Sequence, residues 1–124
     1  MKNYNELSDN EKKELKGKIN KELEKFYQDK NNNNSHNESI LEKTALAILE
    51  IAITYEIIEE KCLNNSLYVN RIKYHIMDSY LADKITNEIL MTFQLYPTAL
   101  ISSVVNAIEE ADYEQYDNDY EMEL

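Results

Sequence analysis

Residues 40–63, ILEKTALAILEIAITYEIIEEKCL, form the most apolar stretch of the chain. At about 100° per residue, the polar side chains crowd one side of this segment and leave an apolar arc of roughly 200°. The arc contains Leu41, Ala45, Leu46, Ile48, Leu49, Ala52, Ile53, Tyr55 and Ile57. Ser39 and Glu42 have the spacing of a capping box, which predicts a helix over 40–63. Because a helix this apolar needs at least two others to cover it, the segment predicts a helical bundle.

A first helix is predicted over 9–29. Ser8 and Glu11 form a second capping-box pattern at its start. Its apolar residues recur at helical spacing and predict a core-facing stripe of Leu15, Ile19, Leu23, Phe26 and Tyr27. Residues 31–37 contain no apolar side chain and are rich in asparagine, which predicts a flexible loop between the first two helices.

Two further helices, 67–78 and 82–96, are predicted after Asn64, Asn65 and Ser66, which have cap-forming side chains. The first apolar stripe is Val69, Ile72, Ile76 and Tyr80; the second is Leu81, Ile85, Ile89, Phe93 and Tyr96. The two stripes lie on nearly opposite faces of a continuous helix, so we expect a break between Asp78 and Asp83, with Asp78, Ser79 or Asp83 as the cap. The alternative is one central helix over 67–96 that is buried on two sides.

Pro97 is expected to end the fourth helix and to open a last one over 98–114. The inward positions of that helix are Ile101, Val104, Ile108 and Ala111. The sequence therefore predicts one all-α domain over 1–124, a bundle of four to five helices followed by an acidic tail at 115–124, for which fraying is one of two interpretations.

The composition limits the classes of function. The 124 residues carry a net charge of -11, which repels phosphate and argues against direct binding of nucleic acid. The segment 40–63 holds too many charges for a membrane span. Cys62 has no partner for an internal disulfide, and no apolar leader opens the chain, so we expect a cytoplasmic protein.

Few residues suit catalysis or cofactor binding. Gly17 is the only glycine, which excludes the glycine-rich loops that hold phosphates. Cys62, His36 and His75 are too few for a structural zinc site, and neither histidine has a glutamate three residues before it, as a di-metal carboxylate site needs. His75 and Asp78 share a helix face, where a solvated or capping role is expected. Cys62 is expected to be a small core residue, and we predict a non-enzymatic protein without cofactor or metal.

The end of the chain is the remaining functional signal. Residues 109–124 contain eight carboxylates and no Lys or Arg. Three tyrosines among them are spaced so that a helix aligns them within roughly 60°, on a side about 100° from the core stripe. We predict a binding element for a protein with a basic surface, formed by Glu109, Glu110, Asp112, Tyr113, Glu114, Tyr116, Asp117, Asp119, Tyr120 and Glu121. The alternative is a solvated, frayed terminus.

Two classes of function are compatible with this pattern. The first is a small acidic inhibitor that occludes a basic, nucleic-acid-handling protein. In size and charge, though in no motif, the chain resembles inhibitors from phages and mobile elements, such as anti-CRISPR proteins. The second is a helical adaptor, oligomerisation subunit or toxin-immunity protein that binds through the apolar face of 40–63, so homo-oligomers are also expected in this class.

Overall fold

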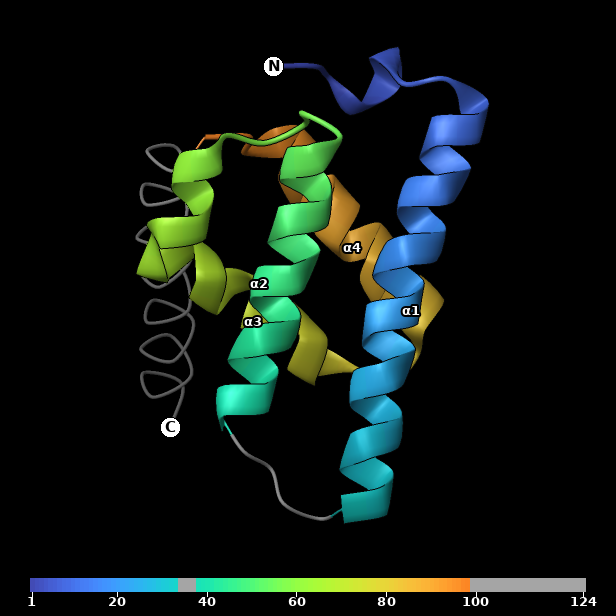
Figure 1. The fold of residues 1–124 in the computed structure, drawn as a ribbon, viewed down its shortest axis with the longest axis vertical. Helices are drawn as coiled ribbons and strands as arrows, with labels where there is room; N and C mark the ends of the chain where they lie inside the picture. The colour runs from blue at the N-terminus through green and yellow to red at the C-terminus, as the bar shows by residue number, and fades with distance from the viewer. Residues whose placement is uncertain (34–37, 99–124) are drawn as a thin grey trace, which may run out of the picture.

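The computed structural model describes residues 1–33 and 38–98 (Figure 1). Four α-helices make up most of this part: α1 (Asp9–Asn33), α2 (Glu38–Thr54), α3 (Ser66–Asp78) and α4 (Ala82–Leu95). Two short 3-10 helices, η1 (Tyr4–Glu6) and η2 (Glu60–Asn64), precede α1 and α3. The described residues contain no strand, which confirms the predicted all-α bundle. The predicted helix 98–114 and tail 115–124 lie outside the described residues, except for Thr98.

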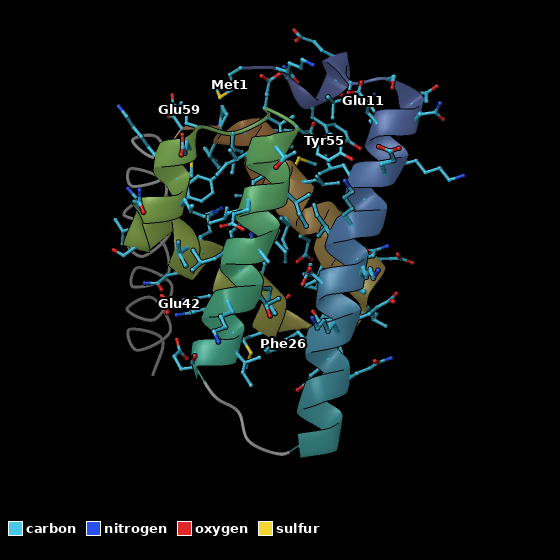
Figure 2. The ribbon with its side chains drawn as sticks, viewed as in Figure 1. Met1, Glu11, Phe26, Glu42, Tyr55 and Glu59 are labelled. Atoms are coloured by element: carbon cyan, nitrogen blue, oxygen red, sulfur yellow. The ribbon has the colours of Figure 1, made fainter. Side chains whose placement is uncertain are left out.

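α1 and α2 run side by side in opposite directions, and α4 crosses behind them (Figure 1). α1 packs against α2 and α4, and α3 packs against α2 and α4, so all four helices share one core. The predicted stripe of α1 is buried over its whole length, from Leu15 to Tyr27. The apolar arc of α2 also faces this core, and Figure 2 shows side chains filling the space between the two helices. The most deeply buried members include Leu15, Ile19, Leu23, Ile48, Leu49, Ile72, Ile76, Ile85, Ile89 and Phe93.

The start of α1 is as predicted and its end is not. The Ser8 hydroxyl accepts a hydrogen bond from the Glu11 N–H at 3.1 Å, and the Ser8 N–H donates to the Glu11 carboxylate at 3.0 Å. The helix then continues to Asn33, so the prediction of a loop from residue 31 is wrong for its first three residues. Asparagine is only a weak helix breaker, and no glycine or proline follows Gly17 in α1 to end the helix earlier. α2 begins at Glu38, which places Ser39 inside the helix rather than at its cap.

The prediction of one helix over 40–63 is wrong, because α2 ends at Thr54. The Ile57 N–H donates to the Ala52 carbonyl at 3.2 Å, and the Glu56 N–H donates to the Ile53 carbonyl at 2.9 Å. This pair of bonds is a Schellman motif, which usually has glycine at the left-handed position. Here Glu56 occupies that position with φ 62°, so the glycine signal that marks such helix ends is absent from the sequence.

The predicted break between α3 and α4 is confirmed. Asn65 caps α3 by accepting a hydrogen bond from the Tyr68 N–H at 3.0 Å. Ser79 follows α3, and its hydroxyl accepts a hydrogen bond from the Leu81 N–H at 3.2 Å. Leu81 occupies the N-cap position of α4, where no side chain provides a cap hydrogen bond. Tyr80 is the last residue of the first predicted core stripe and Leu81 is the first residue of the second. Both are wrongly predicted as core residues: they are 60% and 66% exposed, because they lie in this turn.

Within residues 1–33 and 38–98, no helix has the combination of length and hydrophobicity needed to cross a membrane.

Candidate functional site

The ten residues predicted to bind a partner all lie beyond Thr98, outside the described residues. The charges of the chain can still be compared between its two parts. All 13 Lys and Arg residues precede residue 85, whereas eight of the 24 acidic residues follow residue 108. The four-helix body is therefore close to balanced, and most of the net charge of -11 belongs to residues 99–124.

The body holds Tyr96 and Pro97, next to the last residue that the structure describes, by hydrogen bonds. The Tyr68 hydroxyl donates to the Tyr96 carbonyl at 2.6 Å. The Glu59 N–H donates to the Pro97 carbonyl at 3.0 Å, and the Cys62 thiol contacts the same oxygen at 3.7 Å. Since Tyr68 and Cys62 are fully buried, these bonds fix the backbone of residues 96 and 97 against η2 and α3.

Cys62 has the environment of a structural residue, as predicted. Its thiol is buried, and burial raises its pKa to about 11, with a smaller effect from the charge of Glu59. Burial also raises the pKa of the Tyr68 hydroxyl. Because the thiolate is the reactive form of cysteine, a buried thiol with a raised pKa is a poor nucleophile.

His75 lies between α3 and α4 rather than in solvent, so the expectation of a solvated or capping role is wrong. Its Nε2 lies 2.9 Å from the Thr92 hydroxyl, and its Nδ1 lies 3.8 Å from the Glu88 carboxylate. A hydroxyl, an imidazole and a carboxylate in this order also occur in catalytic sites, where the hydroxyl is the nucleophile, the imidazole is its base and the carboxylate orients the imidazole. Thr92 is only 3% exposed, however, and its hydroxyl donates to the Glu88 carbonyl at 3.2 Å, so it has no proton to give to His75. This arrangement joins two helices and lacks an accessible nucleophile.

The described residues contain no group of three or more His, Cys, Asp or Glu side chains placed to hold a metal ion.

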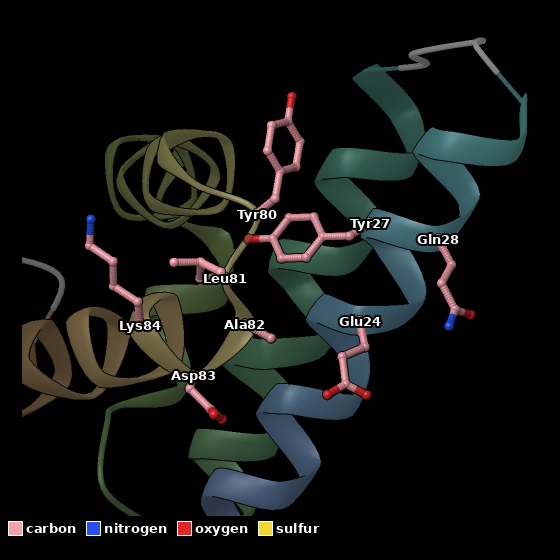
Figure 3. A pocket seen from close by; sticks show the side chains of 8 residues that line it. All are labelled: Glu24, Tyr27, Gln28, Tyr80, Leu81, Ala82, Asp83 and Lys84. Atoms are coloured by element: carbon pink, nitrogen blue, oxygen red, sulfur yellow. The ribbon is translucent and has the colours of Figure 1, made fainter.

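A groove of about 610 Å³ opens between α1 and the turn that joins α3 to α4 (Figure 3). Tyr27 extends from α1 toward this turn, and its hydroxyl donates to the Ile76 carbonyl at 3.0 Å. Burial raises the Tyr27 pKa to about 12, with smaller contributions from Tyr80 and Glu88, so the phenol stays neutral. The Tyr80 ring stands edge-on to that of Tyr27, with centroids 5.7 Å apart and planes at 75°. Two aromatic rings therefore form one wall of the groove.

The rest of the groove combines apolar and charged side chains. Leu81 and Ala82 continue the apolar surface along the turn. The carboxylates of Glu24 and Asp83 lie on the same side of the groove in Figure 3, one from α1 and the other from α4. Asp83 is held in place by the Asn20 amide, which donates to it at 2.7 Å. Gln28 and Lys84 complete the lining, so the groove has two carboxylates and one ammonium group.

The sequence did not indicate this groove, because Tyr80 and Leu81 fitted the ends of two core stripes. One signal that Leu81 is not a core residue was nevertheless present in the sequence. If a helix begins at residue 82, its N-cap is a leucine, a side chain that does not accept a hydrogen bond there.

The chain matches no protein-family model, no curated protein and no solved structure.

Proposed function

We propose that this protein is a small, non-enzymatic binding protein that occupies a basic surface on a protein partner. The observation that carries the proposal is the separation of charge along the chain: no Lys or Arg follows Lys84, and eight carboxylates lie in residues 109–124. A dense negative segment attracts a positive surface over about 8 Å at physiological salt and speeds encounter with it.

The four-helix body supports this role as a scaffold. Tyr68, Glu59 and Cys62 hold the backbone of residues 96 and 97 against the body, twelve residues before the first tail carboxylate, Glu109. The proposed contacts are the ten acidic and tyrosine residues between Glu109 and Glu121, and a basic protein that handles nucleic acid is the proposed target class.

The proposal is tested by capture of proteins from host extract on two immobilised baits. One bait is the full-length protein, and the other has amides in place of five tail carboxylates, at Asp112, Glu114, Asp117, Asp119 and Glu121. We expect basic proteins on the first bait only, and we expect salt to elute them. A third bait with amides at the exposed Glu42, Glu50 and Glu60 controls for general loss of charge and should behave as the first. Equal recovery on the first two baits would contradict the proposal.

A second candidate function is self-association. The apolar arc of α2 lies in the core, so an adaptor surface must lie elsewhere. Leu67, Tyr74 and Met77 are 41%, 74% and 46% exposed and fall on one side of α3. We propose a second copy of the chain as the occupant of this face. Sedimentation over a wide concentration range should then show a dimer that Tyr74→Ser weakens, whereas a monomer at every concentration would exclude it.

A further inference from the structure

The turn between α3 and α4 presents two large apolar side chains to solvent. Tyr80 is 60% exposed and Leu81 is 66% exposed, and both line the groove. The Tyr80 ring packs edge-on against Tyr27, whose own hydroxyl is bound to α3. A rigid, half-exposed tyrosine is a typical anchor in protein interfaces, because it contributes apolar contact with little loss of entropy.

Leu81 is also the N-cap residue of α4, a position where leucine stabilises a helix less than a polar residue does. Its backbone adopts φ -96° and ψ 99°, as an N-cap residue does, but its side chain accepts no hydrogen bond from α4. Side chains cap η1, α1 and α3 through Asn3, Ser8 and Asn65, whereas η2 and α4 have no side-chain cap, and among these N-cap residues Leu81 alone is apolar. A residue that neither caps its helix nor packs in the core is a common mark of a functional position.

Charge defines the kind of partner that fits this surface. Glu24 and Asp83 lie beside the apolar wall, and Asp78, the last residue of α3, is exposed just before the turn. Lys84 is the only cation that lines the groove. A segment that carries lysine or arginine next to an aliphatic side chain would satisfy both the carboxylates and the apolar wall.

We propose that the groove binds a basic, amphipathic segment of a protein partner, with its apolar residue against Tyr80 and Leu81 and its cations at Glu24 and Asp83. This inference rests on the proposed function and adds a second contact surface, apart from the acidic tail. The tail supplies attraction over distance, and the groove supplies the apolar anchor that determines specificity.

The test is a titration of the full-length protein with a short, fluorescent amphipathic peptide of lysine and leucine, followed by anisotropy. A leucine–glutamate peptide of the same spacing is the charge control. Leu81→Ser removes the anchor while it adds a cap acceptor, so we expect its thermal unfolding midpoint to stay within about 4 °C of that of the unsubstituted protein. Met91→Ser is the matched variant, since Met91 is 54% exposed on α4 and does not line the groove.

We expect the lysine–leucine peptide to bind, the glutamate peptide to fail, and Leu81→Ser to weaken binding at least about tenfold. Met91→Ser should leave binding unchanged. The inference is overturned if the lysine–leucine peptide does not bind, or if Leu81→Ser and Met91→Ser bind it equally.

The tail variant with five amides separates the two proposals. If amides abolish peptide binding and Leu81→Ser does not affect it, the acidic tail acts alone. If only Leu81→Ser weakens it, and both baits recover the same proteins, the groove stands and the tail proposal fails.

Discussion

Replacement of Gly17 by alanine should stabilise the protein by about 1 kcal/mol. Gly17 lies in the interior of α1, two residues from each of the fully buried Leu15 and Ile19. A Cβ built at this position meets nothing within 4 Å beyond the adjoining residues and the backbone of its own helix, so the methyl group causes no clash. Alanine loses less backbone entropy than glycine when a helix forms, which is the source of the expected gain of about 0.8–1.0 kcal/mol.

Urea denaturation followed by circular dichroism measures this gain directly. For a chain of this size, 1 kcal/mol corresponds to a rise of about 4 °C in the thermal midpoint. Lys21→Ala is the matched control, because Lys21 is exposed one turn further along α1 and already favours a helix, so its replacement should change stability by less than about 0.3 kcal/mol.

A loss of stability in Gly17→Ala would refute this reasoning. It would mean that another surface approaches the backbone of α1 at Gly17, either the segment 99–124 or a second copy of the chain. Peptide binding in the groove should not change in this variant, because Gly17 does not line it.

Three further predictions concern single groups. Glu56→Gly should stabilise the protein by about 0.5–1 kcal/mol in the same urea assay, because φ 62° strains a residue with a Cβ; no gain would count against the Schellman turn. Cys62 should react with a thiol reagent far more slowly in the native protein than in urea, and fast native labelling would contradict its burial. Stability should fall as the pH rises from about 10 to 12, because the Tyr27 phenol ionises near 10 when unfolded and near 12 when folded, so alkali favours the unfolded chain. Tyr27→Phe should reduce this fall, and an equal slope would contradict it.

Hydrophobic periodicity was sufficient to predict the core of the bundle. Every member of the predicted stripe in α1 is buried, as are Ile72, Ile76, Ile85 and Ile89. These positions follow from the spacing of apolar residues alone, because a helix buries one side and that side repeats every 3.6 residues.

Helix ends were harder to predict, because the usual signals are missing. Glu56 occupies a position that usually holds glycine, so α2 appeared to continue to residue 63. Leu81 occupies a position that usually holds a polar cap, so it appeared to belong to the core. Tyr68 is fully buried and lies outside the predicted stripe, and its hydroxyl donates to the carbonyl of Tyr96, 28 residues further along the chain. Such long-range contacts depend on how helices pack, which local spacing does not determine.

The groove depends on tertiary structure in the same way. Glu24 and Asp83 belong to different helices and are brought together by the packing of α1 against α4, which the Asn20–Asp83 hydrogen bond reinforces. No sequence pattern relates the two residues, whereas the acidic tail is visible in the sequence because its charges are contiguous.

The most direct test of the proposed function is the comparison of proteins captured from host extract by the full-length bait and by the bait with five tail amides. We predict that basic proteins are recovered on the full-length bait, that salt releases them, and that the amide bait does not retain them. Recovery of the same proteins in equal amounts on both baits would contradict the claim that this protein binds a basic partner through its acidic end.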